Sequence, residues 1–368
     1  MSAHHLTVVG GGVIGLSIAW RAAAAGYSVT IVDPAPGRGA SWVAGGMLAP
    51  VAEAWPGEEA ALALGEESLR RWPEFAQALA RDGGDPRLDQ SGTVVVALDR
   101  ADADALDILA GYLRSVGRDV ERVTSRRLRS LEPGLGAVRG GLLVPGDLAV
   151  DNRRLLRSLE AAARRHGAQF TGHEVVTVEP GRVRTTHHDV RCDTVVIAAG
   201  ARSARLHPVL ARGVRPLKGE ILRLRARRTS LPPPTRTVRA VVEGRPVYLV
   251  PRADGGLVLG ATQYEAGYDD SVTARGVREL LDSAERIFPS IAEYELVETA
   301  AGLRAASVDT LPFIGDLGDG VLAATGHHRN GLLMAPVTAD AVLAVLAGEK
   351  PPDEALAADP ARLEPGGS

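Results

Sequence analysis

The chain of 368 residues has little cysteine and little lysine: Cys192 is its one thiol, and Lys218 and Lys350 are its two lysines. A single cysteine cannot form an intrachain disulfide, which favours a cytoplasmic location over an oxidising compartment. Because 40 of the 42 basic residues are therefore arginines, an arginine at any one position carries little information by itself. The sequence also has no apolar run of membrane-spanning length and no cleavable leader, so neither a membrane span nor secretion is predicted.

Charge is low as well, with a formal net charge of -3. Such a balance gives no field that would gather nucleic acid or an anionic membrane surface, and both classes of partner are disfavoured. Histidines occur as adjacent pairs at residues 4–5, 187–188 and 327–328. Neighbouring side chains diverge on a helix or strand, and no third ligand stands at useful spacing, so no metal site is predicted.

The first thirty-three residues carry the most specific pattern in the chain. A predicted strand is followed by Gly10, Gly12 and Gly15, an apolar helix, and a second strand that ends at Asp33. Gly10 suits a tight turn, Gly12 lets a pyrophosphate approach the backbone, and Gly15 lets the helix pack on the strand. The carboxylate of Asp33 stands where a ribose would offer its hydroxyls. This pattern predicts a dinucleotide bound at the N-terminus of the first helix.

Two later segments extend the predicted site. Residues 193–200 form an apolar strand ending in small residues, which would let the backbone pass close to the nucleotide, although any buried parallel strand has this pattern. Residues 325–336 place glycines at a strand-to-helix corner, with a helix predicted from about Gly331 to Gly348. Converging N–H groups there would stabilise the negative charge of a reduced flavin ring, so this corner indicates flavin binding. Glycine corners also begin many ordinary helices.

The remaining pattern predicts two domains, as the length of the chain also favours. Residues 38–53 are predicted to form a long loop, and residues 48–59 are the expected lid. Helical spacing in 58–81 is interrupted at Pro73, which predicts a pair of helices. The fold class expected is α/β, with a Rossmann-type FAD-binding domain and an α+β substrate domain that contains an antiparallel sheet. The FAD-binding domain would consist of residues 1–85, 146–213 and 301–365, and the substrate domain of 86–145 and 214–300.

With these segments identified, the chain resembles the FAD-dependent D-amino-acid oxidase superfamily, and within it the glycine oxidases of thiamin biosynthesis. The resemblance covers nearly the whole chain. It is carried by Val9–Gly15, Ser41–Pro50, Pro216–Glu220, Tyr248–Arg252, Gly260–Thr262, Ala301–Arg304 and Gly326–Leu333.

Together, the resemblance and the glycine turns give a set of candidate FAD-binding residues. These are Gly10, Gly12, Val13, Ile14, Gly15, Asp33, Ser41, Ala44, Gly45, Gly46, Met47, Val175, Ala199, Gly200, His327, His328, Arg329, Asn330, Gly331, Leu332 and Leu333. No histidine lies in the loop of residues 38–53, so the FAD is expected to be bound non-covalently.

For the catalytic side, the resemblance implies that Arg304 clamps the carboxylate of an amino-acid substrate, that Tyr248 adds its hydroxyl, and that Arg329 stands near the flavin edge. A guanidinium presents paired donors that match the two carboxylate oxygens, which fixes the substrate in one orientation. Arg304 stands among small apolar residues, unlike a surface charge. Tyr248 lies in an apolar run and could instead belong to the core.

The implied reaction is oxidative deamination of glycine to an imine, then glyoxylate and ammonia, with hydrogen peroxide formed from oxygen. The resemblance also implies a role in thiazole formation for thiamin, a link to thiazole synthase, and a homo-oligomer. Pro246 and Gln263 replace the histidine and methionine that glycine oxidases carry over the site. Two alternatives stay open: an oxidase or dehydrogenase of sarcosine or small D-amino acids, and a non-catalytic flavin-binding assembly protein.

Overall fold

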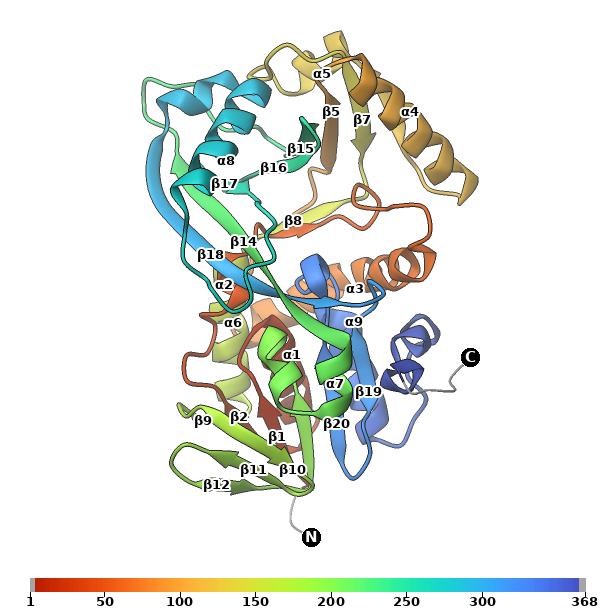
Figure 1. Ribbon diagram of the computed structural model, residues 1–368, viewed down its shortest axis with the longest axis vertical. Coiled ribbons are helices and arrows are strands. Elements are labelled where there is room, and N and C mark those ends of the chain that lie inside the picture. Colours follow the sequence, from red (N-terminus) through yellow and green to blue (C-terminus); the bar gives the residue numbers. More distant parts are fainter. Residues whose placement is uncertain (1–3, 364–368) are drawn as a thin grey trace.

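The computed structural model describes residues 4–363 and shows an elongated molecule with two large sheets, one above the other in Figure 1. Residues 1–3 and 364–365 of the predicted FAD-binding domain lie outside the described residues. The lower part combines a mostly parallel sheet with helices, and the upper part is built on a strongly twisted, mostly antiparallel sheet.

Six strands form the lower sheet, in the order β19-β20-β13-β1-β2-β9. All neighbours pair in parallel except the edge pair β19 and β20. Their bounds are β1 His5–Val9, β2 Ser28–Val32, β9 Gln169–Thr171, β13 Thr194–Ile197, β19 Phe313–Asp316 and β20 Val321–Thr325. Apolar residues occupy both faces of β1 and β13, as a parallel sheet covered on both sides requires.

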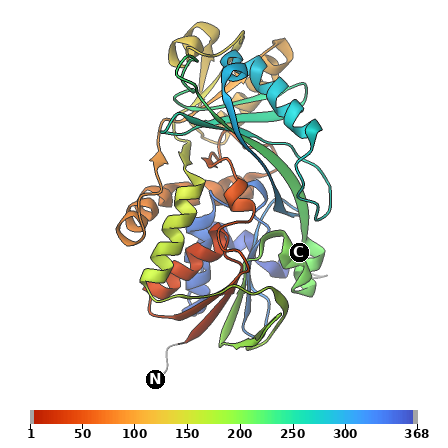
Figure 2. The same cartoon turned by 90° about the vertical axis from the view of Figure 1, so that its left-hand side faces the viewer.

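The two faces of this sheet are covered differently. One face packs against the helices α1 Val13–Ala24, α3 Glu59–Asp82, α6 Asn152–Arg165 and α9 Ala335–Leu346. The other face packs against α7 Pro208–Gly213 and a small sheet formed by β10 Val175–Glu179, β11 Arg182–Thr185 and β12 Asp189–Arg191. Figure 2 shows the helices α1 and α6 on one side of the sheet and this small sheet on the other. The sheet is therefore buried between the two layers.

Eight strands form the upper sheet, in the order β18-β14-β17-β16-β15-β5-β7-β6. Only β15 and β5 pair in parallel. Their bounds are β5 Thr93–Ala97, β6 Glu121–Thr124, β7 Gly140–Val144, β14 Val214–Arg225, β15 Thr237–Val242, β16 Arg245–Pro251, β17 Gly256–Gly260 and β18 Glu295–Ser307. Helix α8 Ala274–Ile287 covers one end of this sheet, and α4 Arg100–Ser115 packs on β7 at the other.

The long paired strands β14 and β18 connect the two parts of the molecule (Figure 1). The predicted domain boundary at residues 300–301 falls inside β18, so one continuous strand crosses it. The remaining α-helices and strands of the described chain are α2 Ala40–Val43, β3 Met47–Leu48, β4 Leu88–Asp89, α5 Ser125–Leu131 and β8 Leu148–Val150. Strands β3, β8 and β4 form a small sheet at the level of the junction.

Two sequence-based expectations in the first ninety residues are wrong. Residues 38–53 are not a plain loop, because they contain α2 and β3. Residues 58–81 are not a helix pair, because α3 continues through Pro73. An interior proline removes a helical hydrogen bond and crowds the preceding turn, but the side chains of Ser68 and Trp72, just before it, both donate to the carbonyl oxygen of Leu333, at 2.7 Å and 2.9 Å. These contacts hold α3 continuous across the proline.

The late helix also differs from the expectation, since α9 begins at Ala335 and not near Gly331. His328 has a φ of 49°, outside the right-handed helical region, and residues 328–330 form a 3-10 turn. Pro336 lies in the first turn of α9, where its fixed φ and missing N–H are tolerated. The glycine corner therefore leads into the helix through a tight turn.

Candidate cofactor and substrate site

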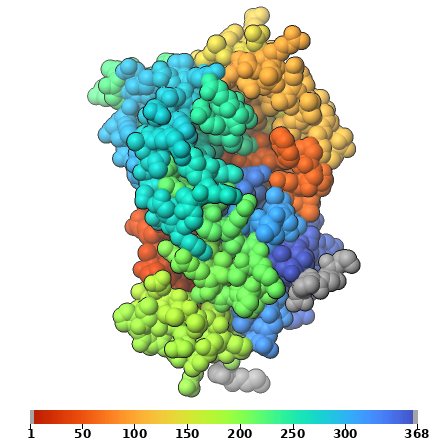
Figure 3. Space-filling view, viewed as in Figure 1, coloured from red at the N-terminus to blue at the C-terminus, as the bar shows by residue number. Residues whose placement is uncertain are grey.

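A cavity of about 1390 Å³ lies at the junction of the two parts. Its lining comes from the carboxyl ends of β1, β2, β13 and β20 and from β14, β16 and β18 of the upper sheet. Pockets for drug-sized ligands usually occupy about 300–1,000 Å³, so this cavity is large enough for a dinucleotide and a small substrate. In the space-filling view, green and cyan segments lie over the middle of the molecule, where the two parts meet (Figure 3).

The glycine turn at the end of β1 is shaped for close backbone approach. Gly10 has a φ of 107°, and a Cβ there would overlap the carbonyl oxygen of Ala198. A Cβ on Gly15 would overlap the carbonyl of Gly10, so Gly15 packs the helix on the turn and does not line the cavity. Gly12, the N-cap residue of α1, has no side chain with which to cap the helix, so first-turn amides other than that of Val13, which binds Ser41, are left for a phosphate.

Asp33 and Ser41 organise this end of the cavity. The Asp33 carboxylate accepts hydrogen bonds from the amides of Gly11, at 2.6 Å, and Ala35, at 2.7 Å. The Ser41 hydroxyl accepts one from the amide of Val13, at 3.1 Å. Asp33 and Ser41 both line the cavity. Bound to the turn in this way, the Asp33 carboxylate is held beside the place where a ribose would lie.

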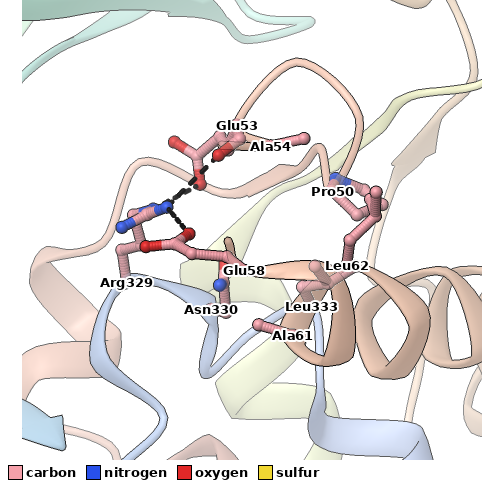
Figure 4. A pocket seen from close by; sticks show the side chains of 9 residues that line it. All are labelled: Pro50, Glu53, Ala54, Glu58, Ala61, Leu62, Arg329, Asn330 and Leu333. Carbon is pink, nitrogen blue, oxygen red and sulfur yellow. Dashed lines mark hydrogen bonds and ion pairs between the residues drawn. The ribbon is translucent and has the colours of Figure 1, made fainter. Parts of the chain in front are cut away.

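Most of the predicted cofactor residues come together in this single cavity. Those that line it are Gly10, Gly12, Val13, Ile14, Asp33, Ser41, Ala44, Gly45, Gly46, Met47, Val175, Ala199, Gly200, His327, His328, Arg329, Gly331 and Leu332. Asn330 and Leu333 instead line a small neighbouring pocket of about 20 Å³, where Arg329 also lies (Figure 4). The glycine cradle, the N-terminus of α1 and the cavity volume all fit an FAD.

Both histidines of the late corner are neutral near pH 7. Burial lowers the pKa of His327 to about 3, and its Nε2 shares a hydrogen bond of 2.9 Å with the Thr338 hydroxyl. Burial also lowers the pKa of His328 to about 4, with a smaller contribution from the charge of Arg329. Within residues 4–363, the Nε2 atom of His328 has no hydrogen-bond partner. Neither imidazole adds positive charge to this corner.

Tyr248 of β16 and Arg304 of β18 line the same cavity at the upper sheet. A Cβ on Gly45 would lie 2.6 Å from the Tyr248 ring, and one on Gly260 would overlap its hydroxyl. The ring therefore lies in a slot between two glycines. A Cβ on Gly219 would likewise overlap the guanidinium of Arg304.

Tyr248 is neutral near pH 7, and Arg304 stays charged despite its burial. Arg304 Nη1 donates to the carbonyl oxygen of Thr262 at 3.2 Å, which fixes the guanidinium. Burial raises the pKa of Tyr248 and lowers that of Arg304, and the charge of Arg304 partly offsets the first shift. A neutral phenol thus faces the same space as a guanidinium cation, and such a pair can bind a carboxylate with both ionic and hydrogen-bonding contacts.

Arg329 has carboxylate partners of its own. Its Nε lies 3.4 Å from Glu53 Oε2, and its Nη2 lies 3.2 Å from Glu58 Oε2 (Figure 4). Its Nη2 also donates to the backbone oxygen of Glu53 at 3.2 Å. Sequence reasoning identified Arg329 but missed both glutamates, because their partners are more than 250 residues away in the chain.

Pro246 and Gln263, the two departures noted in the sequence, both line the cavity. Their position is consistent with an effect on substrate preference.

Within residues 4–363, no group of three or more histidine, cysteine, aspartate or glutamate side chains is arranged to hold a metal ion. Over the same range, no helix combines the length and apolar character that a membrane crossing would need.

The comparisons with known sequences agree on one family. The profile of the family described as "FAD dependent oxidoreductase" matches residues 5–344. Glycine oxidase from Pseudomonas aeruginosa is 33% identical over 98% of this chain and 98% of its own length. Glycine oxidase from Geobacillus kaustophilus is 32% identical over 91% and 90% of the two chains. A bifunctional protein ThiO/ThiG from Trichormus variabilis is 32% identical over 91% of this chain but 51% of its own length.

Solved structures give the same result for the fold. The crystal structure of glycine oxidase from Geobacillus kaustophilus superposes with a TM-score of 0.89 and 30% identity, over 97% of this chain and 98% of that one. Iminodiacetate oxidase from Chelativorans sp. superposes with a TM-score of 0.85 at 24% identity, over 96% and 98% of the two chains, and shares the fold. The predicted α/β fold class is confirmed.

Proposed function

Because the chain belongs to the family of FAD-dependent oxidoreductases, we propose that it catalyses the oxidative deamination of glycine. The imine that forms hydrolyses to glyoxylate and ammonia, and molecular oxygen takes up the two electrons and becomes hydrogen peroxide. Relatives called glycine oxidase support this proposal along nearly the whole chain. The observation that carries it is the Tyr248 and Arg304 pair, which shares one cavity with the glycine turn after β1.

The proposed roles of the cofactor residues follow from their places in the cavity. Gly10 and Gly12 would admit the pyrophosphate to the N-terminus of α1, and Asp33 would hold a ribose hydroxyl. The segment from His327 to Leu332 would border the ring system. When bound, FAD supplies the hydride acceptor for the α-carbon of the substrate.

On the substrate side, Arg304 would bind the carboxylate of glycine through paired N–H donors, and the Tyr248 hydroxyl would donate to the same group. The hydrogen bond from Arg304 to Thr262 and the glycine slot around Tyr248 hold both groups in place before the substrate arrives. No separate general base is assigned, because hydride transfer needs only a substrate amine that is neutral. Flavin reduction should therefore quicken as pH rises through the ionisation of that amine, measured by anaerobic stopped-flow absorbance.

The first test is peroxide release in air from the purified yellow protein on addition of glycine, sarcosine, D-alanine and D-proline in turn. Highest kcat/KM for glycine is expected. A better turnover of sarcosine or a D-amino acid would move the assignment to the first alternative. Dye reduction without peroxide would identify a dehydrogenase, and a flavin that no amine bleaches would identify a non-catalytic binding protein.

Arg304→Ala tests the substrate site itself. Loss of the buried charged partner should weaken amino-acid binding by about 2 to 4 kcal/mol, measured as the substrate dependence of anaerobic flavin bleaching. Arg304→Lys is the matched control, because it keeps the charge but loses the paired geometry and should recover only part of the affinity. Unchanged affinity in Arg304→Ala would refute the site assignment.

Three wider expectations rest on the relatives and on composition. The bifunctional ThiO/ThiG proteins join a similar chain to a second part, which supports a functional link to thiazole synthase and a role in thiamin biosynthesis. The single cysteine supports a cytoplasmic location. A homo-oligomer is the expected assembly, and size-exclusion chromatography with light scattering would measure it.

A further inference from the structure

The loop of residues 49–58 connects β3 to α3 and forms one wall of the cavity. Ala52, Glu53, Trp55 and Glu58 of this loop line the same cavity as Arg304. Trp55 is 66% exposed, so it contributes little buried apolar surface to hold the loop down. The apolar residues of the loop that are buried, Ala49, Ala52 and Ala54, have small side chains, so polar contacts add substantially to what fixes the loop across the cavity.

One set of these contacts comes from the upper sheet. Arg239 of β15 places Nη2 at 3.0 Å from Glu53 Oε1, and its Nη1 donates to the backbone oxygen of Ala52. The Arg239 and Glu53 side chains are only 16% and 11% exposed. A pair so far removed from water is screened weakly by salt, and loss of one partner leaves the other charge uncompensated.

The second set comes from the lower part. Arg329, four residues after β20, contacts the Glu53 side chain, the Glu53 backbone oxygen and Glu58 (Figure 4). Glu53 is thus the residue on which an arginine from each part of the molecule converges. Glu58 contributes at the point where the loop enters α3.

We propose that Glu53 is a positioning residue that latches the loop of residues 49–58 across the substrate end of the cavity by pairing with Arg239 and Arg329. Opening the loop then requires both ion pairs to separate. In this arrangement Arg329 anchors the loop through its carboxylate partners. The identity of the substrate rests on the proposed function, but the latch is a property of the chain without substrate.

Hydrogen exchange of the FAD-loaded protein, without substrate, tests the latch. Amide exchange in peptides covering residues 49–58 should be at least about tenfold faster in Glu53→Gln than in the wild type. Arg239→Gln removes the other partner and should give the same change, which keeps the test valid if one variant fails to fold. Glu160→Gln is the matched control, since Glu160 pairs with Arg164 on the solvent-facing side of α6, and it should leave the loop unchanged.

The possible results of this experiment distinguish a failure of the latch from a failure of the proposed glycine oxidation. Faster loop exchange in both variants supports the latch, whether or not the wild type oxidises glycine, and glycine activity is then judged by the peroxide assay alone. Wild-type exchange in both variants overturns the latch. A raised KM in Glu53→Gln without faster loop exchange also overturns it, because Glu53 would then act by contacting the substrate.

Discussion

Gly219 determines where the guanidinium of Arg304 can lie, because any Cβ there would overlap it. Gly219→Ala should therefore push the tip of a flexible side chain aside while the fold stays intact. We expect KM for glycine to rise about tenfold to a hundredfold, equal to about 1.4–2.8 kcal/mol, with little change in thermal unfolding. An unchanged KM would mean that the Arg304 guanidinium does not bind the substrate in this position.

His327 makes the stability of the protein sensitive to acid. Its pKa falls from 6.5 to about 3 on folding because of burial, so the unfolded chain takes up a proton that the folded protein excludes. The stabilisation is complete above pH 6.5 and is lost as pH falls toward 3, by up to about 1.4 kcal/mol per pH unit. Urea unfolding at pH 8 and pH 5 measures this loss.

The variant His327→Gln can still bond the Thr338 hydroxyl but does not titrate. Its loss of stability between pH 8 and pH 5 should be smaller than that of the wild type. Equal losses would show that His327 is not the group responsible.

At this scale the sequence predicted the residues that belong to a recognisable motif. Gly10 and Gly15 were predicted from the glycine spacing, although Gly10 approaches the distant Ala198. Tyr248 and Arg304 were identified through the family resemblance, and both line the cavity. The glycines that shape the site around them, Gly219 and Gly260, could not be predicted. Their importance arises from side chains on neighbouring strands of a sheet whose register the sequence does not specify.

Two glycines in helices show that the atoms packed around a residue can outweigh its intrinsic helix propensity. Gly111 lies in α4, and apart from its own stretch of helix no atom of the described chain is within 4 Å of the place of its Cβ. Gly276 lies in α8, where a Cβ would overlap the buried carboxylate of Glu220. That carboxylate also accepts a hydrogen bond from the Thr273 amide, at 2.9 Å, so it cannot move aside cheaply.

Alanine substitutions at these positions should have opposite effects. Gly111→Ala should stabilise the protein by about 0.5–1 kcal/mol, whereas Gly276→Ala should destabilise it by about 1–3 kcal/mol. Chemical denaturation of the two variants in parallel gives the comparison. If both substitutions stabilised the protein, or both destabilised it by the same amount, the described packing of Glu220 would be contradicted.

Element by element, periodicity predicted helices at residues 101–116 and 151–167, which match α4 and α6 to within two residues, but it missed the strands β6, β7, β9, β18 and β19. It failed where tertiary contacts overrode a local rule. Pro73 predicted a break, but the hydrogen bonds of Ser68 and Trp72 to Leu333 hold α3 together. Glycine and serine content predicted a loop in residues 38–53, but β8 recruits residues 47–48 as a strand.

For the whole molecule, the cavity between the two large sheets makes the cofactor a structural component. Saturation with FAD at about a hundred times its Kd should add about 2.7 kcal/mol to the free energy of unfolding. Circular dichroism and tryptophan fluorescence should report the same rise in melting temperature, because both parts line the cavity. ADP is the matched control and should stabilise less. A melting temperature independent of FAD would contradict the assigned cavity.

The strand order of the lower sheet also has a consequence for how the protein is made. Strand β1 pairs with β13, and β13 pairs on its other side with β20. Strand β20 comes late in the sequence and ends at Thr325. At roughly 5–20 residues per second, a ribosome needs about 16–65 s to reach that strand. The cofactor wall from His327 onward is absent until then, so a nascent chain carries most of its hydrophobic surface for this interval without the flavin that would stabilise it. Flavin supply should therefore affect yield chiefly after synthesis is nearly complete.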